Sequence, residues 1–148
     1  MADSVFDIKR LSFDEVHNLL LRMSDCFTPP LSQGVDIQEY SKKLASYANF
    51  LTCEENGQVL GFIAYYQNYA AKQIYITLIC VDEKFQRSGI GAKLLERLQQ
   101  VAKGSGKKYQ SIGLEVNKVN SKAHCFYVKY GFVEQEDRGE KLLMEKTL

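Results

Sequence analysis

The sequence predicts a mixed α+β fold in which a largely antiparallel sheet of about seven strands is flanked by about four helices. Two observations carry this prediction. Segments with strand-like and helix-like apolar patterns follow one another in the order β-α-α-β-β-β-α-β-α-β-β. Short turns join consecutive strands in the middle and at the end of the chain, and such turns produce antiparallel hairpins rather than a doubly wound parallel sheet.

Two helices in the first half of the chain are predicted by capping boxes, in which a side chain and a glutamate three residues later satisfy free N–H groups. Ser12 with Glu15 begins the first helix, and Asp36 with Glu39 begins the second. The paired prolines between the two helices cannot continue a helix, so we expect residues 28–34 to form a loop.

Runs rich in β-branched and aromatic residues predict the strands, and turn residues bound each run. The predicted strands cover Val5–Leu11, Phe50–Cys53, Val59–Tyr66, Gln73–Val81, Ser111–Val116, Phe132–Glu134 and Leu142–Lys146. Glu55-Asn56-Gly57 predicts a hairpin turn between two of these strands. A third helix follows Gly91, and a short fourth helix runs from Asn120 or Ser121 through Tyr130.

Composition indicates an ordinary globular domain that spans the whole chain, residues 1–148. Hydrophobic residues make up 45% of the sequence, charged residues make up 25%, and the net charge is +1. This balance disfavours nucleic-acid binding, which usually requires a basic face. No apolar run approaches the ~20 residues that span a bilayer, and the N-terminus lacks an export pattern. We therefore expect a cytoplasmic protein that binds neither nucleic acid nor membrane.

The cysteines are expected to be reduced thiols. Cys26, Cys53, Cys80 and Cys125 include no CxxC pair, which disfavours a zinc site. Free thiols are also typical of cytoplasmic proteins.

A glycine-containing turn at Gln86–Gly91 joins a strand to a helix and points to phosphate binding. The first N–H groups of a helix lack partners and carry partial positive charge, and glycine lets the backbone approach a ligand closely. Arg87 and Lys93 add positive charge. The sequence contains no P-loop string, and Leu94 occupies the third glycine position of the dinucleotide fingerprint. A third pattern, Q/R-x-x-G-x-G/A, is matched by Gln86, Gly89 and Gly91.

This pattern and a second one downstream resemble the GNAT superfamily of acyl-CoA-dependent N-acetyltransferases. The second pattern consists of Asn120, Ala123, Tyr127, Gly131 and Phe132, in the order in which the family carries them. The resemblance covers essentially the whole chain. It implies a GNAT-like fold, acetyl-CoA as co-substrate without a metal, and direct transfer of the acetyl group to an amine.

The resemblance also implies roles for particular residues. Tyr127 matches the family tyrosine that protonates the leaving thiolate, although its spacing also suits a core aromatic. Asn120 matches an asparagine that contacts the cofactor, and it is equally suited to cap a helix. The other residues expected against the cofactor are Ile79, Cys80, Val81, Gln86, Arg87, Ser88, Gly89, Ile90, Gly91 and Ala92.

A general base is harder to assign. Many members of the family carry a glutamate on the strand before the turn, but Gln73–Val81 contains no carboxylate. Glu115 on the next strand is the candidate catalytic base, acting directly or through a water. A solvent-facing strand glutamate is the structural alternative, and Asp82 is a weaker candidate.

The sequence does not identify the acceptor. A small metabolite amine, an amino sugar, an antibiotic and a protein N-terminus all suit the chemistry, and either a monomer or a homodimer does too. We expect the acceptor near residues 28–34 and the Gln135–Lys141 turn, whose acidic residues would attract a cationic amine. Because the strand carboxylate is missing, a non-catalytic module that binds or senses acyl-CoA is the alternative function.

Overall fold

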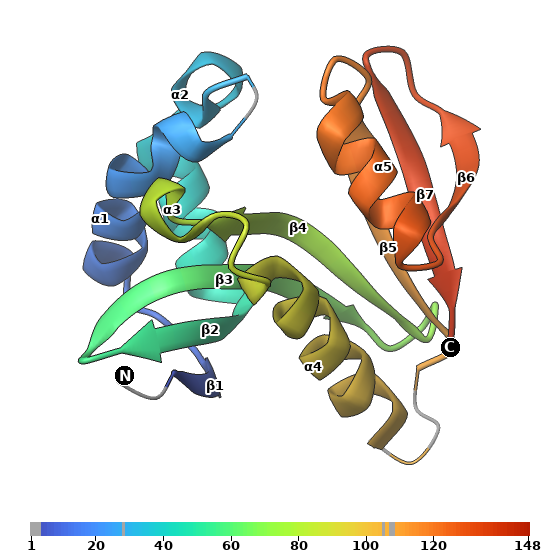
Figure 1. Ribbon diagram of the computed structural model, residues 1–148, viewed down its shortest axis with the longest axis horizontal. Coiled ribbons are helices and arrows are strands. Elements are labelled where there is room, and N and C mark those ends of the chain that lie inside the picture. The colour runs from blue at the N-terminus through green and yellow to red at the C-terminus, as the bar shows by residue number, and fades with distance from the viewer. Residues whose placement is uncertain (1–3, 28, 105, 107–108) are drawn as a thin grey trace.

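The computed structural model describes residues 4–27, 29–104, 106 and 109–148 (Figure 1). Its helices and strands follow the predicted order, with one additional helix, α2 (Leu31–Gly34), between the first two predicted helices. They are β1 (Val5–Lys9), α1 (Phe13–Met23), α2 (Leu31–Gly34), α3 (Ile37–Tyr47), β2 (Asn49–Glu55), β3 (Gln58–Asn68), β4 (Gln73–Val81), α4 (Ile90–Gly104), β5 (Ser111–Asn117), α5 (Ser121–Lys129), β6 (Val133–Asp137) and β7 (Lys141–Thr147). Short 3₁₀ helices cover Ser24–Cys26 and Glu83–Phe85.

The seven strands form one sheet in the order β1-β2-β3-β4-β5-β7-β6. Every neighbouring pair is antiparallel except β4 and β5, which are parallel. Two apolar clusters stabilise the layers. One packs α4 and α5 against the sheet, and the other packs α1 and α3 against it. The predicted α+β class with a largely antiparallel sheet is therefore confirmed.

The two parallel strands at the centre of the sheet separate from each other. Their pairing ends at Ile76 opposite Leu114, although β4 and β5 both continue beyond those residues. A bulge lies at Thr77, because Ala64 pairs with Leu78 and the next residue of β3 pairs with Ile76. A bulge bends its strand and increases the local twist. The sheet consequently opens into two wings, as Figure 1 shows for β4 and β5.

The first correction to the predicted elements is α2, which lies where a loop was expected. Helix α1 ends at Met23, before the prolines, and Pro30 has a φ of −52° and lies just before the first residue of α2. Proline is tolerated at a helix start, where its missing N–H would have had no partner. The N–H of Val35 then donates to the carbonyl of Leu31 at 3.2 Å. Thr28 itself lies outside the described residues.

Two predicted turns are shorter than expected. Helix α4 begins at Ile90, so Gly91 belongs to the first turn of the helix rather than to the preceding loop. Strand β6 extends to Asp137 and β7 begins at Lys141, because a bulge between Glu134 and Glu136 lets the pairing continue.

The caps and the hairpin turn follow the sequence signals, with one difference. Ser12 and Glu15 form the complete capping box. Asp36 accepts a hydrogen bond from the N–H of Glu39 at 3.1 Å, but the Glu39 carboxylate lies 3.4 Å from Lys42. The second cap is therefore one-sided.

Candidate active site

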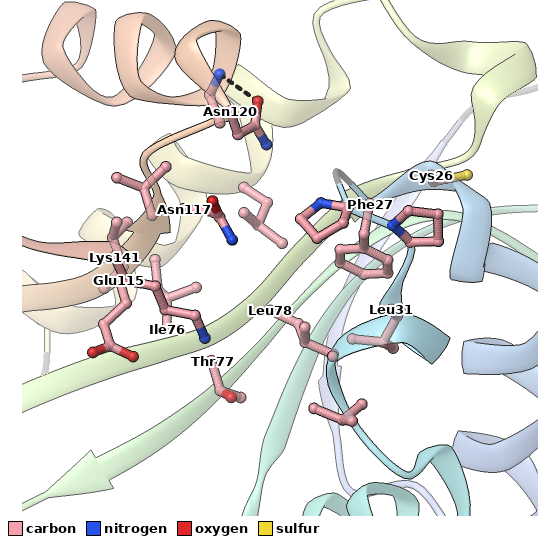
Figure 2. A pocket seen from close by; sticks show the side chains of 18 of the residues that line it. Cys26, Phe27, Leu31, Ile76, Thr77, Leu78, Glu115, Asn117, Asn120 and Lys141 are labelled. Carbon is pink, nitrogen blue, oxygen red and sulfur yellow. Dashed lines mark hydrogen bonds between the residues drawn. The ribbon is translucent and has the colours of Figure 1, made fainter. Parts of the chain in front are cut away.

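The opening between β4 and β5 holds a pocket of about 260 Å³ (Figure 2). Residues 76–79 of β4 form its floor, and residues 114–117 of β5 form one wall. The opposite wall comes from the segment that joins α1 to α3, including Phe27, Pro30 and Leu31. Helix α5 and the first residue of β7 complete the lining. The pocket therefore exists because the two parallel strands separate.

The turn before α4 presents backbone N–H groups. Arg87 and Gly89 have φ values of 69° and 84°, which place both in the left-handed region. The Gln86 side chain donates to the Val81 carbonyl at 3.1 Å, and the Ser88 hydroxyl donates to the Phe85 carbonyl. Among the described residues, none accepts a hydrogen bond from the N–H groups of residues 87–92. These groups suit an anion such as a pyrophosphate.

Gly91 lies beside α5 at the beginning of α4. A Cβ atom on Gly91 would lie 3.4 Å from Cζ of Phe126 and 3.8 Å from Cγ2 of Val81, which is ordinary van der Waals contact. The first turn of α4 is therefore adjacent to the helix that carries Tyr127.

Tyr127 lines the pocket and is only 6% exposed. Its ring packs edge-on against Phe132, with ring centroids 5.7 Å apart, and against Phe126 at 5.6 Å. Burial raises the pKa of the Tyr127 phenol above its ordinary value near 10. The phenol is therefore protonated at neutral pH and can donate a proton, so Tyr127 belongs to both the core and the pocket.

Asn120 lines the pocket and caps α5. Its Oδ1 accepts a hydrogen bond from the N–H of Ala123 at 3.1 Å. The predicted cap is confirmed. Because Oδ1 accepts that bond, the amide nitrogen Nδ2 is the side-chain atom of Asn120 with donors available for a ligand. Contact with a cofactor stays a prediction.

The last residues of β4 present one edge of their backbone to the opening. Ile79, Cys80 and Val81 pair with β3 on one side, whereas their pairing with β5 has already ended. Ile79 lines the pocket, but Cys80 and Val81 do not. The Cys80 side chain packs into the α1–α3 cluster, and burial raises the pKa of its thiol. Any ligand contact by Cys80 would therefore use its main chain.

Glu115 lines the pocket, and a cation already holds its carboxylate. Nη1 of Arg138 donates to Oε2 of Glu115 at 3.1 Å. Tyr75 lies nearby; its burial, followed by the charge of Glu115, raises the pKa of Tyr75 to about 12. Glu115 thus lines the pocket as one member of an ion pair, and its role as a base stays a prediction.

Asp82, the weaker candidate base, has structural partners instead. Its Oδ2 accepts from Nη1 of Arg22 at 2.8 Å, and its Oδ1 accepts from the N–H of Lys84 at 3.0 Å. Asp82 does not line the pocket. It ties α1 to the short helix that precedes the anion-binding turn.

The acidic residues near the β6–β7 turn are mostly paired with bases. His124 lies 2.7 Å from Glu134, Arg138 lies 2.9 Å from Glu136, and Lys118 lies 2.7 Å from Asp137. Arg138 and Lys118 therefore offset part of the negative charge of the expected acidic rim.

Lys141 is a pocket residue that the sequence placed in the Gln135–Lys141 turn, near the expected acceptor, without giving it a role of its own. It lines the pocket, and no described carboxylate forms an ion pair with it. Only the antiparallel register, in which Lys141 lies opposite Asn117, brings it to this position. No sequence motif marks that register.

The described cysteines are free thiols, as expected. Among the described residues, no group of three or more His, Cys, Asp or Glu side chains is arranged to hold a metal ion. None of the described helices is both long enough and apolar enough to cross a membrane.

Comparison with known proteins gives one family match and partial relatives. A family model described as the Acetyltransferase (GNAT) family matches residues 14–132. An uncharacterized N-acetyltransferase from Methanocaldococcus jannaschii is 34% identical over 92 residues, which cover 59% of this chain and 40% of the relative. The chain thus spans less than half the length of that curated relative.

Solved structures are similar over greater lengths. The PaiA N-acetyltransferase of Thermoplasma acidophilum, in complex with coenzyme A, has a TM-score of 0.76 and 20% identity; the match covers 97% of this chain and 99% of that chain. An acetyltransferase from Bacillus anthracis, in complex with acetyl coenzyme A, has a TM-score of 0.59 and 26% identity, and the match covers 69% and 63%.

Proposed function

This chain belongs to the Acetyltransferase (GNAT) family, and on that premise we propose that it transfers the acetyl group of acetyl-CoA directly to an amine. The resemblance seen in the sequence is thereby confirmed, and the family supports the expectation of an acyltransferase enzyme. One arrangement supports the finer proposal: β4 lines the same pocket as Tyr127 up to Ile79 and then continues, with one backbone edge unpaired, toward the turn at residues 87–92.

The chain has groups suited to each part of the co-substrate. The N–H groups of residues 87–92 and the side chain of Arg87 suit the pyrophosphate. A Cβ on Gly89 would meet no atom within 4 Å, so the space above this residue is open to a ligand. The free backbone edge of Ile79–Val81 suits the amide groups of the pantetheine arm, which would pair with it as an added strand does.

Acyl transfer requires two proton movements, and the pocket offers a residue for each. The amine must lose a proton, because an ammonium has no lone pair with which to attack. Glu115 is the pocket residue that can accept this proton, directly or through a water. As the new C–N bond forms and the C–S bond breaks, Tyr127 donates a proton to the sulfur of the departing thiolate. The protonated Tyr127 is then restored from solvent.

The proposal also includes a cytoplasmic location and a small amine-bearing acceptor. Four free thiols support a cytoplasmic location, and acetyl-CoA with an amine suffices for the chemistry without a metal. Assembly into a homodimer is left to measurement of the mass in solution.

Thermal melting combined with detection of released thiol tests the proposal. Acetyl-CoA should stabilise the protein by about 2.7 kcal/mol at 100 times its Kd. An amine panel should then release free CoA thiol, with the acetylated product identified by its mass. ATP at the same concentration is the control for a general phosphate effect. A melting curve unaffected by millimolar acetyl-CoA would contradict the proposal, and stabilisation without turnover would favour the sensing module.

A further inference from the structure

The pocket contains two charged side chains, and they differ in whether they are paired. Glu115 forms an ion pair with Arg138, whose Nη1 lies 3.1 Å from Oε2 and whose Nε also pairs with Glu136. Lys141 has no ion-pair partner among the described residues. Lys141 is therefore the pocket charge that can pair with an anionic group of a ligand, although the sequence led us to expect an acidic rim.

Glu115 and Lys141 lie on the same face of the sheet. Lys141 pairs with Asn117, and Glu115 lies two residues before Asn117 on β5, so the two are diagonal neighbours about 7–8 Å apart. Figure 2 shows both on the same side of the pocket. A single small ligand can reach both groups at once.

The opposite side of the pocket is apolar. Phe27, Pro30, Leu31 and Val35 line it from the segment between α1 and α3, and Figure 2 shows Phe27 and Leu31 facing the pocket from that side. A ligand that fills the pocket therefore meets charged groups at one end and hydrocarbon at the other.

From this arrangement we infer that the acceptor is an α-amino acid with an apolar side chain, and that Lys141 determines specificity by binding its carboxylate. The inference rests on the proposed acetyl transfer. The acceptor's amino group lies at Glu115, whose carboxylate has about four acceptor sites and can keep Arg138 as well. The ammonium of Lys141 donates to the substrate carboxylate, and the apolar side chain packs against Phe27 and Leu31.

Other amines lack one of the three features. A polyamine has no carboxylate for Lys141 and little apolar surface for the opposite wall. A peptide N-terminus has an uncharged amide in place of the carboxylate, so it leaves the Lys141 charge without a partner. These acceptors are alternative outcomes of the same experiment.

The experiment compares L-leucine and L-phenylalanine with their amides and with their decarboxylated amines. Each amide keeps the side chain and has a more weakly basic amine than the acid. Amine basicity alone would therefore favour the amide. We expect kcat/KM about tenfold higher for each acid than for its amide, because a charged hydrogen bond is gained. Lys141→Met should reduce that ratio to about one or below, and Lys141→Arg should retain it.

Lys103→Met is the matched control, because Lys103 is an exposed residue near the end of α4 that does not line the pocket. It should keep the preference for the acid. The shift in melting temperature caused by acetyl-CoA is measured for every variant and should be unchanged.

Faster turnover of the amides or the decarboxylated amines by the unmodified enzyme would overturn the inference and leave the proposed function standing. Acetyl-CoA binding without acetylation of any acid would also overturn it. Failure to bind acetyl-CoA would instead refute the proposed function.

Discussion

The anion-binding turn and the acceptor end of the pocket are built in different ways. The turn uses backbone N–H groups from consecutive residues, 87–92. The acceptor end uses side chains from separate segments, including Phe27, Glu115 and Lys141. A site made of consecutive backbone groups is recorded in a short string of residues. A site made of distant side chains depends on strand register, which no local string records.

The same contrast applies to electrostatics. At the turn, unpaired N–H groups provide the positive potential, whichever side chains surround them. At the acceptor end, the potential depends on which acidic and basic side chains find each other. Glu115 and Arg138 are 23 residues apart and meet only because the β6–β7 hairpin folds beside β5. Charge counted along the sequence therefore does not show which charged side chains at this end of the pocket are paired.

Replacement of Gly89 by valine should have the largest effect, because it breaks the backbone site directly. The φ of 84° at Gly89 costs a β-branched residue roughly 1–2 kcal/mol, and the loop can escape this strain by moving its N–H groups. We expect acetyl-CoA affinity to fall about 100-fold, as about 2.7 kcal/mol of binding is lost. The measurement is the melting shift as a function of acetyl-CoA concentration.

Gly57→Val is the matched control for this prediction. Gly57 has a φ of 77° and, like Gly89, open space around its Cβ position, but it lies in the β2–β3 hairpin. It should lower the melting temperature comparably and leave acetyl-CoA binding intact. Equal loss of binding in both variants would show that strain alone, rather than the position of the turn, explains the effect.

Tyr127→Phe should reduce kcat about 10²-fold, which is the lower end of the range for a positioned acid. Burial raises the pKa of Tyr127. The folded pKa of Tyr127 therefore lies above the unfolded value near 10, so the phenol is neutral throughout neutral pH. The stability that this neutral phenol contributes to the folded state is lost only as pH rises above about 10. The loss in kcat should accordingly be constant across neutral pH.

Tyr65→Phe controls for the removal of a buried phenol hydroxyl. Tyr65 is 2% exposed, packs in the same core cluster and does not line the pocket. Its kcat should stay within twofold of the unmodified enzyme, as roughly expected for a change away from the chemistry. Parallel losses in the two variants would return Tyr127 to a purely structural role.

The sequence predicts the parts of this protein that local rules govern. Strand β4 has its predicted bounds of Gln73–Val81, and the capping box at Ser12 is complete, because alternation and caps depend on near neighbours. The sequence did not predict α2, since a proline that ends one helix also suits the start of another. It placed Lys141 in the turn near the expected acceptor but gave it no role, since its position in the pocket depends on strand register.

Glu115→Gln should have the smallest effect and is the sharpest test of the acceptor end. The change keeps the size of the side chain and removes its basicity, while Arg138 retains Glu136 at 2.9 Å. We expect kcat/KM to fall about tenfold, less than for a fully enclosed base, because 28% of the Glu115 side chain is exposed and water can accept part of the proton. The loss should be largest at low pH and should shrink as pH approaches the pKa of the acceptor amine, which deprotonates unaided there.

Glu136→Gln is the control, because it removes the other partner of Arg138 outside the pocket, and it should leave the pH–rate profile unchanged. A matching loss in Glu136→Gln would trace the effect to the position of Arg138. A Glu115→Gln profile parallel to that of the unmodified enzyme would show that the acceptor arrives neutral, and Glu115 would then keep only its ion pair.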